Sequence, residues 1–272
     1  MPLNHFIGYG RREARIWLLG LEERVTITAD VNYRLKVLTQ LYRGHQNAEN
    51  PAPGFCGDVR ELHEQYLRHY PDGPEFKEAC KKIQNQVLAH LPTLQPTWDK
   101  LIVLLAGIAG YEPDSPPPPA IRRLYQRDFL GRSAITCEVM LAELFPCPLT
   151  NHSNGAYIDA GGPALFHMDY DEYINQSVAM RVGHDGVLPQ SVPDNVVIIP
   201  YGDVPQMQKH NGFLPEAIRL PNGGNVLPHP RRPIEGVGNA QWCTWGRQIG
   251  DALDKNLRHL IHQQFQQCHA VP

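Results

Sequence analysis

The sequence predicts an α/β protein whose central, mostly parallel four-stranded sheet is flanked by helices. One observation is a short apolar run, Ile-Trp-Leu-Leu at residues 16–19, that stops at Gly20. Another is the β-branched run Asn-Val-Val-Ile-Ile-Pro at residues 195–200. Such runs are typical of strands that are buried on both faces of a parallel sheet. Segments with helical spacing lie between and after them, and interleaved strands and helices indicate an α/β fold.

The remaining elements follow from the spacing of apolar residues. Residues 135–145 fit helical and strand spacing equally well, and Pro146 and Pro148 end that segment in either case. Asn225-Val-Leu predicts a further strand before His229. Amphipathic helices are expected at residues 58–70, 74–91, 121–129 and, as one long terminal helix, 245–265.

Length and composition indicate a single domain. The chain has 272 residues, of which 42% are hydrophobic, and this is enough to bury a full core. We interpret residues 1–272 as one domain with a helical, proline-rich insertion around residues 57–131. Within it, Ser115-Pro-Pro-Pro-Pro119 predicts an extended, exposed connector.

The sequence carries no signal for a membrane or for secretion. The longest apolar run, residues 101–109, is too short to span a bilayer. The N-terminus has no basic region followed by a long apolar stretch. We therefore expect a soluble, cytoplasmic protein without a membrane partner.

Cysteine spacing and net charge narrow the function classes. The six cysteines include no Cys-x-x-Cys pair, which predicts reduced thiols in the core and neither a zinc site nor a disulfide scaffold. A formal net charge of −3 argues against a protein that coats DNA, because phosphate neutralisation needs concentrated Lys and Arg. An enzyme that contacts a few phosphates remains compatible with this charge.

Two turns at predicted strand ends carry candidate catalytic residues. Ligands of an open parallel sheet bind beyond the carboxyl ends of its strands. Gly20-Leu-Glu22-Glu23 places two acids there, although either acid could instead cap the following helix. Pro228-His229-Pro230 holds an imidazole at the end of a later strand, although a lone His in a loop is more often structural.

A third turn, residues 145–151, ends in Asn151, whose amide could face a planar base.

Several common catalytic motifs are absent from the sequence. It contains no phosphate-binding G-x-x-x-x-G-K-[ST] loop, no G-x-S-x-G elbow and no H-E-x-x-H zinc motif. It also lacks the H-x-E and P-C-x-x-C pair of zinc deaminases, so no metal or other cofactor is predicted.

Together these features resemble the uracil-DNA glycosylase superfamily. The chain order is a buried strand that ends in Gly plus an acid, an Asn-bearing segment, and a late strand that ends in His-Pro before a long helix. More narrowly, the chain resembles a prokaryotic branch that includes antiphage glycosylases, which excise α-glucosylated hydroxymethylcytosine from phage DNA. The segments that carry this resemblance are residues 6–10 (FIGYG), 15–23 (RIWLLGLEE), 142–148 (AELFPCP) and 197–202 (VIIPYG).

The resemblance implies a uracil-DNA glycosylase-like three-layer sandwich and assigns roles to individual residues. Glu22 corresponds to the acid that orients the attacking water, with Glu23 as a competitor. Asn151 corresponds to the base-recognising Asn, and His229 to the residue that stabilises the leaving base. Arg231 follows His-Pro where the superfamily has a small residue, and no proline follows the acid. Both departures favour a modified base over uracil.

Further residues are candidates for substrate binding. Arg231 and Arg232 would contact phosphates or a hydroxyl-rich base substituent, and Ile234 would fill the vacated stack as a wedge. Tyr9 or Phe55 would stack on the flipped base, and the sequence does not choose between them. The cysteines lack the spacing of the iron-sulfur branches, so no cluster is expected.

Two alternative functions stay open at this stage. The first is a non-catalytic module of the same fold that binds DNA or a partner protein. The second is a hydrolase that acts on free nucleosides or small glycosides.

Overall fold

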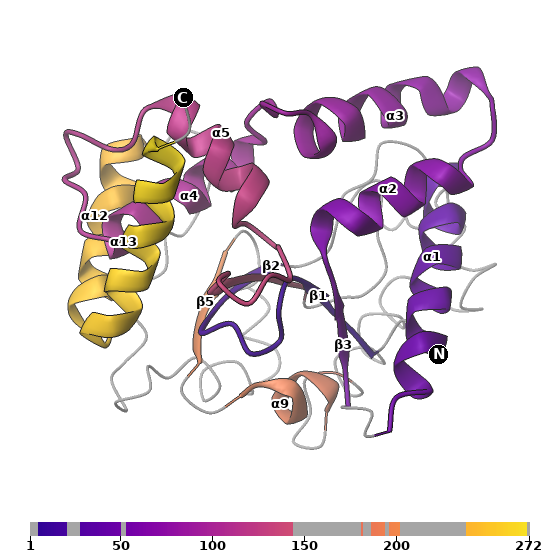
Figure 1. The fold of residues 1–272 in the computed structure, drawn as a ribbon, viewed down its shortest axis with the longest axis horizontal. Helices are drawn as coiled ribbons and strands as arrows, with labels where there is room; N and C mark the ends of the chain where they lie inside the picture. Colours follow the sequence, from indigo (N-terminus) through magenta and orange to yellow (C-terminus); the bar gives the residue numbers. More distant parts are fainter. Residues whose placement is uncertain are drawn as a thin grey trace.

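The computed structural model describes residues 5–20, 28–49, 53–143, 181, 186–193, 196–201 and 238–270. Within these residues the sheet has five strands in the order β3-β1-β4-β2-β5 (Figure 1). Neighbouring strands are parallel except for the antiparallel pair β1 and β4. The predicted α/β class and mostly parallel sheet are therefore confirmed, with five described strands in place of four. The strands are β1 (Phe6–Tyr9), β2 (Ile16–Gly20), β3 (Phe55–Gly57), β4 (Val139–Glu143) and β5 (Val197–Pro200).

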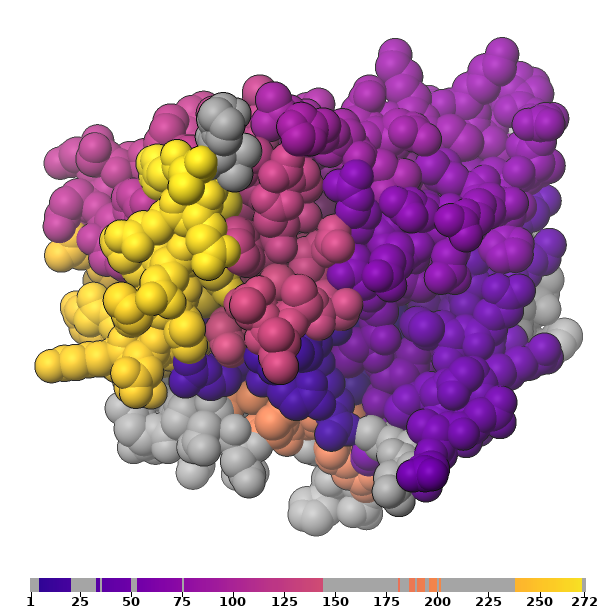
Figure 2. All heavy atoms as spheres, viewed as in Figure 1, coloured from indigo at the N-terminus to yellow at the C-terminus, as the bar shows by residue number. Residues whose placement is uncertain are grey.

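Helices flank the sheet in two groups. One group, α4, α5, α12 and α13, lies on the left of Figure 1, and α1 and α2 lie on the right. On the face shown in the space-filling view, the indigo N-terminal segment is visible over a small area only (Figure 2). This arrangement is compatible with a three-layer sandwich. The helices are α1 (Thr28–Gln46), α2 (Val59–His69), α3 (Lys77–Ile83), α4 (Pro96–Ile108), α5 (Pro119–Asp128), α9 (Val187–Ser191), α12 (Asn239–Asp251) and α13 (Lys255–His269), with a 3₁₀ turn at Pro74–Phe76 and a π turn at Gln84–Leu88.

Most of the predicted elements are confirmed. Strands β2 and β5 and helices α2 and α5 match the expected segments, and the expected helix over 74–91 is present as α3 with its flanking turns. Strand β4 resolves the ambiguous segment 135–145. The expected strand at 225–227 lies outside the described residues. None of the described helices is long and apolar enough to cross a bilayer.

One prediction was wrong, and five elements, among them helices α4 and α9, were not indicated by the sequence pattern. The expected terminal helix is broken into α12 and α13, because the Asp254 side chain accepts a hydrogen bond from the Asn256 amide and starts a new helix. Strand β1 was not expected, since Gly8 interrupts its apolar pattern. Gly8 has a φ of +150°, and a side chain there would overlap the carbonyl oxygen of Leu141. Strand β3 and helix α1 were not predicted either.

Helices α4 and α12 approach each other closely through glycine. A Cβ atom on Gly246 of α12 would overlap the carbonyl oxygen of Leu104, and one on Gly107 of α4 would overlap that of Cys243. Eight consecutive residues of α4, Leu101–Ile108, are buried in this layer. Segment 57–131, which the sequence suggested as an insertion, thus contributes a central helix to the core.

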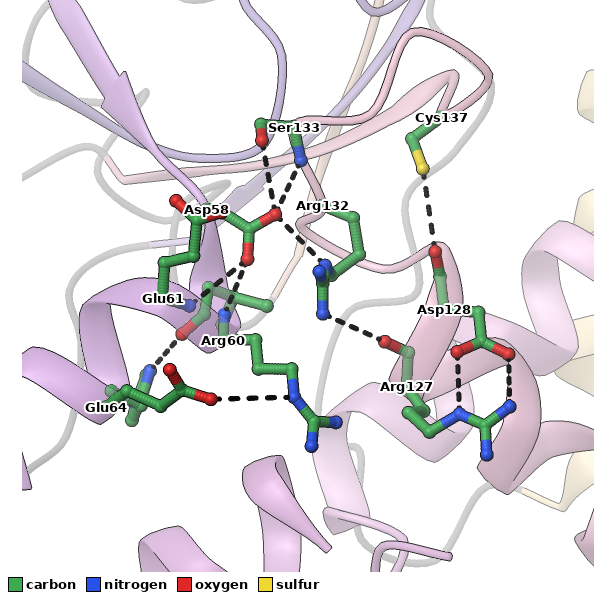
Figure 3. A network of polar contacts seen from close by, with 11 residues as sticks. Asp58, Arg60, Glu61, Glu64, Arg127, Asp128, Arg132, Ser133 and Cys137 are labelled. Atoms are coloured by element: carbon green, nitrogen blue, oxygen red, sulfur yellow. Dashed lines mark hydrogen bonds and ion pairs between the residues drawn. The ribbon is translucent and has the colours of Figure 1, made fainter. Parts of the chain in front are cut away.

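A buried carboxylate joins α2 to the segment that follows α5 (Figure 3). The Asp58 side chain is only 2% exposed. Its Oδ1 caps α2 by accepting from the amides of Arg60 and Glu61 at 2.9 and 3.2 Å. Its Oδ2 accepts from Arg132 Nε at 3.0 Å, and from the amide and hydroxyl of Ser133 at 2.9 and 3.2 Å. Asp58 therefore satisfies five donors from two chain segments.

We predict that Asp58→Ala strongly destabilises the protein. Loss of the carboxylate removes the cap of α2 and leaves Arg132 and three amide donors without their acceptor, a loss of about 2–4 kcal/mol in the free energy of unfolding. Urea unfolding followed by circular dichroism measures it. The exposed Asp72 is the matched control, and Asp72→Ala should change the free energy by less than about 0.5 kcal/mol. Equal midpoints for the two variants would contradict the assigned role of Asp58.

A second prediction compares two helical glycines. Gly246→Ala should destabilise the protein by about 1–3 kcal/mol, because the new methyl group forces α12 away from α4. Gly44→Ala, on α1, meets no atom within 4 Å and should be neutral or stabilise by up to about 1 kcal/mol. Thermal melts of both variants test the contrast. A Gly246→Ala variant at least as stable as the parent would show that this close helix contact is not needed.

Candidate active site

Three parallel strands end at one edge of the sheet, which we call the carboxyl edge. Strand β2 lies between β4 and β5 and is parallel to both. Gly20, the last residue of β2, pairs with Glu143, the last residue of β4. Tyr201 directly follows β5, and its amide donates to the carbonyl of Leu19 at 2.9 Å. Because ligands of open α/β sheets bind beyond the carboxyl ends of the strands, we define the candidate site by Gly20, Glu143 and Tyr201.

These three residues share one face of the sheet. Residues paired in register project to the same side, so the Glu143 side chain lies on the face where a Gly20 side chain would lie. The Tyr201 hydroxyl occupies that same face, 2.5 Å from the position of a Cβ atom on Gly20. The absence of a side chain at Gly20 therefore makes room for the phenol ring. The Glu143 side chain and the Tyr201 hydroxyl therefore lie on the same face at the end of the central strand.

Arg181 holds the end of β4 in place. Its side chain is fully buried, and its guanidinium donates to the carbonyl oxygens of Phe6 and Glu143 at 2.8 and 2.7 Å. The antiparallel ladder between β1 and β4 has only two residue pairs, Gly8 with Ala142 and Tyr9 with Leu141. Arg181 bridges the two strands just beyond this ladder. It thus satisfies buried carbonyl groups and places a permanent positive charge beside Glu143.

Of the residues that the sequence suggested for the site, Gly20 lies where it was expected, at the end of a buried central strand. All of the candidate catalytic residues lie outside the described residues and stay predictions. The same holds for most of the candidate substrate-binding residues. They are Glu22, Glu23, Asn151, His229, Arg231, Arg232 and Ile234.

Tyr9 and Phe55, the two candidates for stacking on a base, are core residues. Tyr9 is 3% exposed, and its ring lies against Phe6 and His63 at centroid distances of 5.4 and 5.9 Å. Its hydroxyl lies 3.5 Å from that of Tyr66. Phe55 is 4% exposed and packs against Phe6. Since other side chains already cover both rings, we remove Tyr9 and Phe55 from the substrate-binding candidates.

The sequence interpretation did not single out Glu143, Tyr201 or Arg181. Glu143 could have been noticed as the one charged residue within the apolar segment 139–145. Tyr201 follows the predicted strand directly, and a residue at that place is a site candidate in any parallel sheet. Nothing in the local sequence around Arg181 indicates that its guanidinium bridges two strands far away in the chain.

Four of the five described cysteines have a raised thiol pKa. Cys56, Cys80, Cys137, Cys243 and Cys268 form no disulfide. Burial raises the pKa of the Cys56 and Cys268 thiols to about 12, and it also raises the pKa of Cys137 and Cys243. Because the thiolate is the reactive form, the raised pKa values of these four thiols disfavour nucleophilic chemistry at neutral pH. Within the described ranges, no group of three or more His, Cys, Asp or Glu residues is placed to hold a metal ion.

Comparisons with protein-family models, with curated proteins and with solved structures found no match to this chain.

We predict slow alkylation of Cys56 and Cys268 in the folded protein. At pH 9 half of the thiols with an ordinary pKa of 9.0 are ionised, but only about one in a thousand with a pKa of about 12. Iodoacetamide should label both residues at least about 100-fold more slowly in the native protein than in urea, as measured by peptide mass spectrometry. Ionisation between pH 9 and 12 favours the unfolded chain, so stability should fall as the pH rises through this interval. Equal labelling rates in the native protein and in urea would contradict the burial of these thiols.

Proposed function

We propose that this protein is a DNA glycosylase that flips a modified base out of DNA and hydrolyses its N-glycosidic bond, leaving an abasic site. The observation that carries the proposal is the carboxyl edge, where Gly20, Glu143 and Tyr201 share one face. The Gly-Leu-Glu-Glu motif continues from Gly20, so the chain leaves this edge with two further acids. This placement supports a catalytic acid at Glu22 or Glu23 over a simple helix cap.

The chemistry requires few protein groups. A base within a duplex is inaccessible, so flipping costs a few kcal/mol, which stacking and edge hydrogen bonds partly offset. Cleavage leaves positive charge on the sugar and negative charge on the departing base, as at other glycosidic centres with oxocarbenium character. In this proposal Glu22, with Glu23 as competitor, stabilises the sugar cation and orients the water. His229 donates to the leaving base, and preorganised donors of this kind contribute strongly to catalysis.

The substrate we propose is modified phage DNA, with α-glucosyl-hydroxymethylcytosine as the excised base. Arg231 and Arg232 suit this substrate, because guanidinium groups bind phosphates and the hydroxyl groups of a sugar. Asn151 contacts the base edge and Ile234 fills the vacated stack. Phage DNA is encountered in the cytoplasm, so we place the protein there, in antiviral defence. No cofactor is needed for this hydrolysis.

The test is excision from duplexes that carry plain cytosine, uracil, hydroxymethylcytosine or α-glucosyl-hydroxymethylcytosine. We expect alkali-labile strand breaks on the glucosylated duplex, with release of the intact modified base detected by mass spectrometry. His229→Ala should lower the rate by about 10²–10³-fold. Of Glu22→Gln and Glu23→Gln, the variant of the water-orienting acid should show the larger loss. Glu49→Gln, a change of an exposed acid beyond the end of α1, is the matched control and should leave the rate unchanged.

Two results would contradict the proposal. Binding to DNA without strand breaks on any duplex would favour a non-catalytic module. Release of sugar from a free nucleoside, without DNA, would favour a small-molecule hydrolase.

A further inference from the structure

We propose that Glu143 contacts the excised base directly and makes the enzyme selective for pyrimidines that carry an amino group at position 4. This inference rests on the proposed glycosylase function. It assigns a specificity-determining role to a residue that the sequence motifs did not single out.

The position of Glu143 supports contact with a base. It pairs in register with Gly20, and neighbouring strands are about 4.8 Å apart, so its carboxyl group starts one strand away from the motif that supplies the catalytic acid. Gly20 itself adds no side chain between the two. The Tyr201 hydroxyl lies over Gly20 from the other neighbouring strand. A flat ring at this edge would therefore meet a carboxyl group and a phenol hydroxyl from opposite sides of Gly20.

The chemistry of a carboxylate determines which base it accepts. An ionised carboxylate offers only hydrogen-bond acceptors. Cytosine and its 5-substituted forms present the N4 amino donor on the same edge where uracil presents the O4 acceptor. A carboxylate facing that edge binds the amino form and repels the oxo form. A glutamine in the same place would lack this bias, because its amide both donates and accepts.

The surroundings of Glu143 keep it in one place. Its side chain is 7% exposed, so it belongs to an enclosed part of the edge and not to the solvated surface. The buried Arg181 guanidinium donates to the Glu143 carbonyl and to that of Phe6, which fixes the end of β4. Arg181 is thus a positioning residue for Glu143.

A purely structural role for Glu143, as the buried counter-charge of Arg181, makes a different prediction. In that case a change of Glu143 would lower stability and slow excision of every base equally. Base preference is therefore the measurement that separates the two roles. Stability alone does not separate them.

The experiment measures single-turnover excision from two duplexes that carry the same α-glucosyl-hydroxymethyl group on a 4-amino or a 4-oxo pyrimidine. The wild-type protein should prefer the amino base by at least about tenfold. Glu143→Gln should reduce this preference at least about tenfold, through slower excision of the amino base and faster excision of the oxo base. Glu138→Gln is the matched control. Glu138 is a largely buried glutamate that directly precedes β4, at the end of the strand opposite to Glu143, and it pairs with Arg11 and Arg15. This substitution should leave the preference unchanged.

The outcomes separate the inference from the proposed function. No excision of either base by the wild-type protein refutes the function. Excision by the wild type with an unchanged preference in Glu143→Gln overturns the role of Glu143 and leaves the function intact. If Glu143→Gln unfolds at the assay temperature, Glu143→Asp is tested in its place. This variant keeps the carboxylate but moves it back by one methylene group. A reduced preference in that variant then supports the inference, and an unchanged preference overturns it.

Discussion

The pairing of β2 with β4 and β5 is the constraint on which the rest of the structure depends. Strand β2 is buried along its whole length, so its backbone groups have no access to water and must be satisfied by neighbouring strands. Both neighbours run parallel to it and start in register, Ile16 with Val139 on one side and with Val197 on the other. As a result the three strands end at one level. Gly20, Glu143 and Tyr201 are brought together because these ladders keep the same register.

Buried charged side chains stabilise the places where regular pairing stops. Asp58 replaces missing partners at the start of α2 and reaches the chain after α5, and Arg181 bridges β1 and β4 beyond their short ladder. Each is nearly or fully buried, and the removal of either would leave several polar groups without their partner. These contacts give precise positions to backbone segments that no strand or helix continues. At the carboxyl edge, that precision applies to Glu143.

The proposed chemistry and the proposed specificity arise from the same geometry. A glycosylase needs an acid near the sugar and donors or acceptors near the base. The acids after Gly20 serve the first need, and the carboxylate of Glu143, one strand away, serves the second. Acceptor groups facing position 4 favour cytosine-type bases over uracil.

The sequence by itself determined the α/β class, the central strands and most of the helices. Continuous apolar runs such as Ile16–Leu19, and helical spacing such as that of α2, are local signals that depend on burial alone. Tertiary structure decided what local signals do not carry. Gly8 is required in β1 because the Leu141 backbone passes so close to it, and Tyr9 is a core residue because helix α2 covers it with His63 and Tyr66. Likewise, Glu143 is a site residue only through its register with Gly20, 123 positions earlier in the chain. Pairing between distant segments depends on the packing of the whole sheet, which no local pattern specifies.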